Sequence, residues 1–255
     1  MAQAVQTRGP VSGSAAHPRK RRKFFLLDLY STAVGKKYAM ALSGIALMGY
    51  IVAHAIGNLK MYLGPSDINH YGEFLRELLV PLAPRTVVLW ILRVLLFGAL
   101  VLHLHAAYGL TRQNHRARAV KYQGPRDYQA ANFAGRTMRW SGIIIFLFVF
   151  WHLADLTWGW WNAVGTNGTF VRGNVYGNVV RSFDRVPVAI LYIVANIVLG
   201  IHLFWGAWSL FQSMGWNNPR FNQWRRWFAT AFATAIVVIN VSFPIAVLAG
   251  IVSTK

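Results

Sequence analysis

The sequence contains no cysteine and very few acidic residues. Without cysteine, the chain cannot form disulfides, bind an iron–sulfur cluster through thiolates or attach a c-type haem covalently. Only 7 residues are Asp or Glu, and the charged fraction is 13%, against roughly a quarter in an average soluble domain. Any metal site in this chain therefore depends on His, Met or oxygen ligands.

Long apolar segments take the place of the missing charge. Hydrophobic residues make up 55% of the chain, and the mean hydropathy is +0.37. Five segments reach the length of about 20 residues that a bilayer requires. We predict an all-α integral membrane protein whose five transmembrane helices form a bundle, at about 38–62, 86–110, 140–161, 187–211 and 228–252.

The rest of the chain consists of a tail and connections. Residues 1–34 are predicted to be a disordered basic cytoplasmic tail, followed by the five-helix membrane domain at 35–255. The connection at 63–85 contains INHYGEFLREL, which predicts a short amphipathic helix at the membrane interface. Residues 162–186 are rich in Gly and Asn, which is typical of an irregular surface loop.

The net charge of +19 is distributed unevenly between the two sides of the predicted bundle. No nucleic-acid recognition motif accompanies it. Of the basic residues, 18 fall on the side of the N-terminal tail and 7 on the opposite side. Because cytoplasmic loops collect Lys and Arg, we expect a multi-pass protein of a bacterial cytoplasmic (inner) membrane. Its N-terminus would be cytoplasmic and its C-terminus outside.

Each of the first four apolar segments carries a histidine, namely His54, His105, His152 and His202. Imidazoles in hydrocarbon usually face a bundle interior or a functional group. At a rise of about 1.5 Å per residue, His54 and His152 lie in the outer half of the membrane. His105 and His202 lie in the inner half. The matched depths predict two bis-histidine haems, with His54 and His152 on the outer iron and His105 and His202 on the inner iron. The alternative is that each histidine only hydrogen-bonds a neighbouring helix.

Three other polar residues lie inside the predicted helices. His103 is two residues from His105 and points to a different face, so we interpret it as a hydrogen-bond partner rather than a ligand. Arg93 either neutralises a haem propionate or extends to the outer interface. Asp155 is a candidate acceptor for a ligand imidazole or part of a proton path. The histidines outside the segments are interpreted as solvated: His17, His70 and His115.

The sequences around the four histidines resemble a known family. The resemblance rests on HAIGNLKMYLG at 54–64, INHYGEFLREL in the first outer loop, LHAAYGL around His105, WHLADL around His152 and GIHLFWGAWSL around His202. Over residues 35–252 the chain is similar to the cytochrome b membrane-anchor subunit of succinate dehydrogenases and fumarate reductases. The nearest type is the single-chain, five-helix, di-haem anchor that works with menaquinone.

The resemblance implies an electron-transfer subunit of the respiratory chain and the tricarboxylic acid cycle. The four histidines would be the axial ligands of two haem b groups, with no catalytic residue in this chain. On the cytoplasmic side, a flavoprotein with covalent FAD would oxidise succinate. A second partner would carry the iron–sulfur clusters and pass electrons through the haems to quinone.

The position of the quinone site stays open, and two other functions remain. The outer loop offers Asp67, His70, Tyr71, Glu73 and Glu77, whereas the inner side offers Lys36, Lys37 and Ser43. The first alternative function is the cytochrome b subunit of another respiratory complex, such as a hydrogenase or formate dehydrogenase. The second is a haem-free membrane protein that uses the histidines as a proton relay.

Overall fold

The computed structural model describes residues 24–117, 133–160, 170–216 and 218–254. Within these ranges every regular element is a helix, which confirms the predicted all-α fold. The elements are α1 Phe25–Ser31, α2 Ala33–Asn58, η1 Leu59–Leu63, α3 Pro65–Phe74, α4 Val87–Arg116, α5 Phe133–Leu156, α6 Val175–Phe183, α7 Val186–Ser213, η2 Pro219–Phe221 and α8 Asn222–Leu248.

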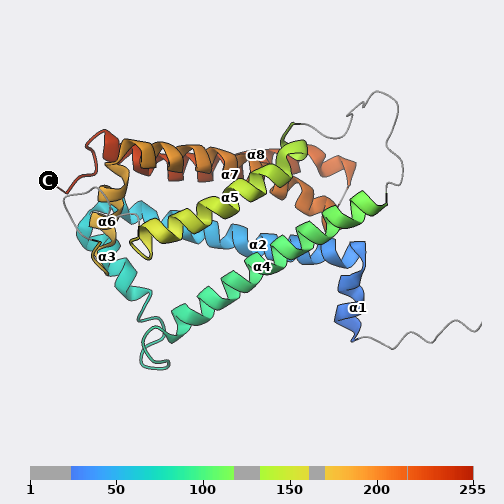
Figure 1. Ribbon diagram of the computed structural model, residues 1–255, viewed down its shortest axis with the longest axis horizontal. Helices are drawn as coiled ribbons and strands as arrows, with labels where there is room; N and C mark the ends of the chain where they lie inside the picture. The colour runs from blue at the N-terminus through green and yellow to red at the C-terminus, as the bar shows by residue number, and fades with distance from the viewer. Residues whose placement is uncertain (1–23, 118–132, 161–169, 217, 255) are drawn as a thin grey trace, which may run out of the picture.

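Five of these helices are long and apolar enough to cross a membrane: α2 with η1, α4, α5, α7 and α8. They run from one end of an elongated bundle to the other, as Figure 1 shows. Because the number of spans is odd, α1 and the C-terminal residues lie at opposite ends of the bundle. The chain is therefore a multi-pass integral membrane protein. Its orientation in the membrane stays a prediction.

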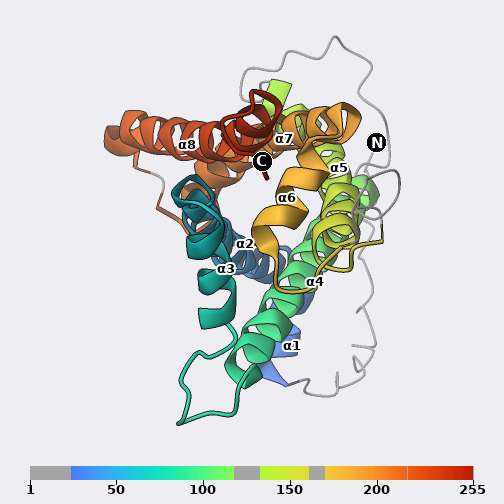
Figure 2. The same cartoon turned by 90° about the vertical axis from the view of Figure 1, so that its left-hand side faces the viewer.

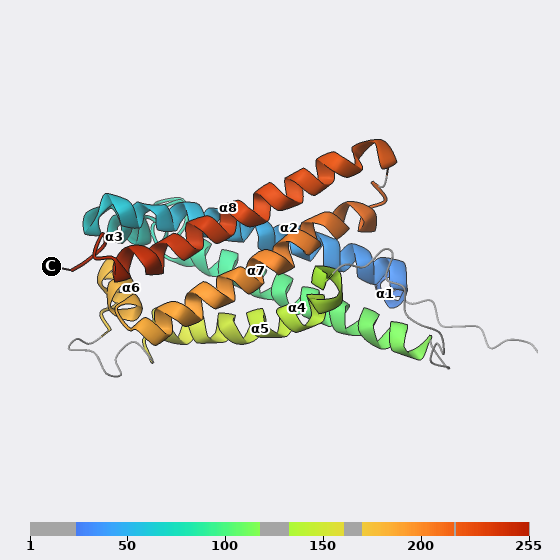
Figure 3. The same cartoon turned by 90° about the horizontal axis from the view of Figure 1, so that it is seen from above.

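The spanning helices pack in two groups. α2 packs against α4, while α7 packs against both α5 and α8 (Figure 3). α2 also contacts α7 and α8 and so joins the two groups. None of the most apolar stretch of α4 is buried, so this helix keeps a large apolar surface for lipid, a partner or a prosthetic group.

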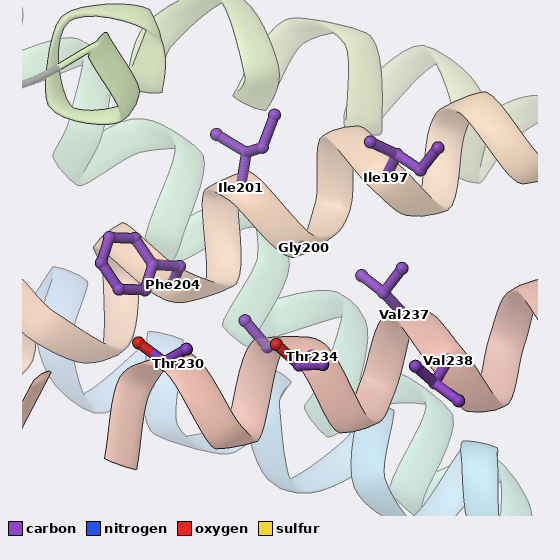
Figure 4. A pocket seen from close by; sticks show the side chains of 9 residues that line it. Ile197, Gly200, Ile201, Phe204, Thr230, Thr234, Val237 and Val238 are labelled. Atoms are coloured by element: carbon purple, nitrogen blue, oxygen red, sulfur yellow. The ribbon is translucent and has the colours of Figure 1, made fainter. Parts of the chain in front are cut away.

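α7 and α8 approach each other closely because small residues line their contact. A Cβ atom on Gly200 would collide with the side chain of Val237. Asn240 Nδ2 donates to Asn196 Oδ1 over 2.9 Å, which adds an interhelical hydrogen bond within the apolar spans. Beside this contact lies an apolar pocket of about 350 Å³, whose polar side chains are Thr230 and Thr234 (Figure 4).

Two short helices, α3 and α6, cover one end of the bundle (Figure 2). α3 confirms the amphipathic helix expected in the first outer loop. α6 was not expected, because residues 162–186 were predicted to be irregular. Its first turn is capped by Asn174, whose side chain accepts from Gly177 N over 2.9 Å. Tyr176 N donates to Asn69 Oδ1 of α3 over 3.1 Å. Residues 161–169 of this connection lie outside the described residues.

α1 lies at the other end of the bundle (Figure 1). Residues 25–31 are helical, which corrects the prediction that all of residues 1–34 are disordered. Residues 1–23, including the basic run, lie outside the described part of the chain. α1 exposes Phe25, Leu26 and Leu27, as an interfacial helix does. Thr32 then starts α2 by accepting a hydrogen bond from Gly35 N over 2.9 Å.

Candidate functional site

The predicted outer pair of histidines comes together in the structure. His54 of α2 and His152 of α5 have ring centroids 5.9 Å apart, with planes at 86°. Tyr50, one turn before His54, stacks on its ring at 5.4 Å. Phe148 and Tyr192 lie against the His152 ring at 6.0 Å and 5.9 Å. The two half-buried imidazoles therefore sit in an aromatic environment between the two groups of helices.

The separation of the outer imidazoles can be compared with that of two axial ligands. Two metal–nitrogen bonds of about 2 Å and two imidazole radii of about 1 Å place the ring centroids about 6 Å apart. The observed separation of 5.9 Å is of this size, and it equals the separation of the His152 and Tyr192 rings. Among the described residues, no three His, Cys, Asp or Glu side chains form a metal-binding group. A pair is sufficient for haem iron, because the macrocycle supplies the four equatorial nitrogens.

A second pair lies on α4 and α7, and it contains His103. His202 Nδ1 is 3.1 Å from Ser141 Oγ of α5. His103 Nδ1 is 3.1 Å from the carbonyl oxygen of Met40 and 3.3 Å from Ser43 Oγ, both on α2. The imidazoles of His103 and His202 are close enough to interact electrostatically. This part of the bundle therefore also contains two half-buried histidines, each of which is held against a neighbouring span.

His105, which the sequence favoured as the inner ligand, is exposed and turned toward α1. Its Nδ1 is 2.5 Å from the hydroxyl of Tyr30, and the two rings are stacked at 5.7 Å. Burial raises the pKa of the Tyr30 hydroxyl, so this hydroxyl stays protonated and can donate to Nδ1. The geometry therefore favours His103 over His105 as the partner of His202. The sequence predicted the opposite assignment, with His105 as the ligand and His103 as a hydrogen-bond partner.

The two histidine pairs lie at different levels along α2. Ser43 marks the level of His103, and His54 follows Ser43 by eleven residues. At the rise of an α-helix, this spacing corresponds to about 16 Å along the axis. The predicted arrangement of an inner and an outer site across the bilayer is compatible with this distance.

Asp155 forms a buried polar cluster near His152. Its side chain is fully buried, and its Oδ1 accepts from Arg185 Nη2 over 2.8 Å. Its Oδ2 accepts from the hydroxyls of Ser182 and Tyr192, the latter over 3.1 Å. The cluster ties α5 to α6 and α7. Asp155 thus has three hydrogen-bond donors, and one of them, Tyr192, lies against the imidazole of His152.

The outer candidates for a quinone site separate into two groups. Asp67, His70 and Tyr71 line a pocket of about 450 Å³, together with Lys60, Ser66 and Phe74. Tyr71 packs against Gly57, less than one turn after His54. Glu73 instead pairs with Arg76 at 2.6 Å and also with Arg85, and Glu77 lies 3.8 Å from Arg85. Through Tyr71, this pocket adjoins the end of α2 that carries His54.

The inner candidates and Arg93 are engaged in local contacts. Lys36 Nζ donates to the carbonyl oxygens of Tyr30 and Ser31 over 3.1 Å and 2.8 Å, and Ser43 contacts His103. Lys37 is exposed. The Arg93 guanidinium lies 5.0 Å from the ring centroid of Trp90 on an exposed face of α4, which favours the interfacial interpretation of this charge.

The sequence-based interpretation of His103 is a hydrogen-bond partner, although the spacing of the histidines also favours it as a ligand. Successive histidines at 54, 103, 152 and 202 are 49, 49 and 50 residues apart. The series with His105 is less regular. Residues two spans apart lie on helices that run in the same direction, so the spacings of 98 and 99 residues suit pairs at a common level, His54 with His152 and His103 with His202. Comparisons of this chain with models of known families, with curated proteins and with solved structures give no match.

Proposed function

We propose that this protein is the membrane-anchoring cytochrome b subunit of a succinate:quinone oxidoreductase. It would bind two haem b groups and work with quinone, menaquinone being expected. The observation that carries the proposal is that four successive spans each hold a half-buried histidine, with the rings of His54 and His152 5.9 Å apart. His103 and His202 are each held by a serine of a neighbouring span. The resemblance of the sequences around the histidines supports the choice of family.

The proposed chemistry divides between the chain and its cofactors. Bound haem iron would supply one-electron transfer at potentials set by its ligands and their surroundings. His54 and His152 would bind at the outer level, and His103 and His202 at the inner level. The aromatic side chains of Tyr50, Phe148 and Tyr192 beside the outer pair would exclude water there. FAD and iron–sulfur clusters would belong to partner subunits on the cytoplasmic side.

The decisive experiment measures haem content and the identity of the ligands. The whole membrane complex is purified, and haem b per chain is determined for the wild type and for alanine variants at positions 54, 103, 105, 152 and 202. Reduced-minus-oxidised spectra then separate the two haems. We expect two haems per chain in the wild type, one spectral component lost in His54→Ala and His152→Ala, and the other in His103→Ala and His202→Ala.

His105→Ala is the matched control for His103→Ala, because the two residues lie on the same turn of α4. It should retain both haems. Loss of haem in His105→Ala, with retention in His103→Ala, would restore the pairing that the sequence first suggested. A wild-type complex without haem would exclude the proposal and favour a proton relay. Haem in a complex that lacks succinate–quinone activity would favour another respiratory enzyme.

A further inference from the structure

A short sequence is repeated in α2 and α5. Both helices contain Met-x-x-Ser-Gly, at residues 40–44 and 138–142, which are 98 residues apart. His54 and His152 are separated by the same 98 residues, and His103 and His202 by 99. α2 and α5 are separated by one intervening span, α4, so they cross the membrane in the same direction. The repeat therefore relates α2 and α4 to α5 and α7.

The repeated sequence makes the same contacts in both places. Ser43 Oγ and the Met40 carbonyl oxygen face His103 Nδ1 at 3.3 Å and 3.1 Å. Ser141 Oγ faces His202 Nδ1 at 3.1 Å, and the Met138 backbone also hydrogen-bonds this imidazole. In each case a serine and a carbonyl of one helix hold a histidine of the next spanning helix.

The glycine of each repeat lies against the same atom of the histidine that the repeat contacts. A Cβ atom at Gly44 would be 3.5 Å from Cε1 of His103, and one at Gly142 would be 3.6 Å from Cε1 of His202. The two imidazoles therefore meet their supporting helices in the same orientation. Two independent helix pairs share one mode of holding a histidine.

The hydrogen bonds of the serines indicate which imidazole nitrogen carries the proton. Ser43 donates its hydroxyl proton to the carbonyl oxygen of Ala39 at 2.7 Å, and Ser141 donates to that of Met138 at 3.0 Å. Each serine oxygen therefore faces Nδ1 as an acceptor, beside a carbonyl oxygen that can only accept. Nδ1 of each histidine must donate, which leaves the lone pair on Nε2.

We propose that Ser43 and Ser141 are positioning residues for the two inner haem ligands. With the carbonyls of Met40 and Met138, they hold His103 and His202 in the tautomer that presents Nε2 to iron. The same hydrogen bonds increase the basicity of the imidazoles and so tune the inner haem. The inference rests on the proposed function, because it requires haem at the inner pair.

The test compares Ser43→Ala, Ser141→Ala and the double variant in the purified complex. Haem content, the midpoint potential of each haem by optical redox titration, and the g-values of the ferric low-spin signals are measured. Loss of an acceptor at Nδ1 makes the imidazole a weaker electron donor. We expect the inner haem to shift to a higher potential, most in the double variant, while the outer haem is unchanged.

Two further variants separate positioning from general helix stability. Ser209→Ala is the matched control, because Ser209 in α7 also bonds a carbonyl of its own helix, that of Gly206, at 3.2 Å. It should leave both potentials unchanged. Ser43→Thr and Ser141→Thr keep the hydroxyl and should therefore show the wild-type potential. If an alanine variant fails to bind the inner haem, restoration of binding by threonine supports the same role.

The possible failures are distinct. Absence of haem from the wild-type complex would overturn the proposed function and this inference with it. Wild-type haem content with unchanged potentials and g-values in the double alanine variant would overturn the inference alone. A shift confined to the outer haem would also overturn it, since the serines face His103 and His202.

Discussion

The environment of a histidine in this bundle is defined by what its Nδ1 nitrogen contacts. His103 and His202 face serine and carbonyl oxygens of neighbouring spans, so their other nitrogen is available to a metal. His105 faces a tyrosine hydroxyl on a short interfacial helix. The partner of Nδ1 thus distinguishes His103, a candidate ligand, from His105, which lies two residues further along α4.

The outer pocket gives a prediction about quinone chemistry. His70 lines this pocket with Asp67 and Tyr71, and Tyr71 packs against Gly57 of α2. If His70 exchanges protons with quinone, His70→Ala should lower succinate-dependent quinone reduction by about tenfold or more, while haem content and succinate oxidation with a soluble dye stay normal. Glu77→Ala, which removes a carboxylate 3.8 Å from Arg85 at the surface, is the control. Equal activity in both variants would exclude His70 from the site.

The buried carboxylate of Asp155 gives a prediction about stability. Asp155→Ala removes the acceptor that Arg185, Ser182 and Tyr192 share. Of these three donors, Ser182 and Tyr192 are buried. Breaking one side of a buried ion pair costs about 3 to 5 kcal/mol, so the thermal midpoint of the detergent-solubilised protein should fall clearly. Asp184→Ala, in the exposed position next to this cluster, should change stability by less than about 0.5 kcal/mol. Similar midpoints for both variants would contradict the structural role of Asp155.

The positions of the histidines along the chain could be predicted, but their faces could not. Hydropathy located four spans with internal histidines, and helical rise gave their depths. His103 and His105 differ by about 200° around the helix axis, and the choice between them requires the rotation of α4. α4 is apolar on all sides of its central stretch, so no polar stripe identifies its inward face.

At the level of elements, close approach of α7 and α8 depends on a few small side chains. Gly200 lies against Val237, and Asn196 accepts a hydrogen bond from Asn240 across the same contact. Between membrane helices, where lipid competes for apolar contact, such packing and hydrogen bonds supply much of the association. The bundle is therefore sensitive to volume added at Gly200.

Gly200→Ala should destabilise the protein by about 1 to 3 kcal/mol, as overpacking does. The measurement is the thermal or denaturant midpoint in detergent. Gly98→Ala is the matched control, because a Cβ at this helical glycine of α4 meets nothing within 4 Å; it should be neutral or slightly stabilising. The double variant Gly200→Ala with Val237→Ala should recover part of the loss. Equal effects of Gly200→Ala and Gly98→Ala on the midpoint would show that the contact between Gly200 and Val237 tolerates the added volume.

Of the short helices α3 and α6, only α3 could be predicted from the sequence. The amphipathic pattern predicted α3, but α6 lies in a stretch whose glycines and asparagines indicated a loop. Its asparagines instead make specific contacts: Asn174 caps the helix, and Asn178 binds both backbone groups of Val171 at 3.1 Å and 2.8 Å. Such tertiary and capping contacts override propensity, and composition alone does not reveal them.

At the level of the whole molecule, the five candidate spans place α1 and the end of α8 at opposite ends of the bundle. The distribution of basic residues predicts that the end with α1 is cytoplasmic. Because the chain has no cysteine, a single introduced cysteine is a unique chemical label. This property permits a direct test of orientation.

Ser66→Cys, at the exposed start of α3, and Asn222→Cys, at the exposed start of α8, lie at opposite ends of the bundle. With an impermeant maleimide on intact spheroplasts, Ser66→Cys should be labelled at once and Asn222→Cys only after permeabilisation. The cysteine-free wild type supplies the background. The reverse pattern would invert the predicted topology.

The spacing of the two histidine levels has an electrical consequence. The levels lie about 16 Å apart along α2, roughly half of the hydrocarbon thickness of about 30 Å. A unit charge that crosses the whole membrane does work of about 2.3 kcal/mol per 100 mV, so an electron moved between the levels does about half of that work. On the proposed function, the membrane voltage acts on the redox balance between the two levels of this protein. Its turnover in sealed vesicles should therefore respond to an imposed potential.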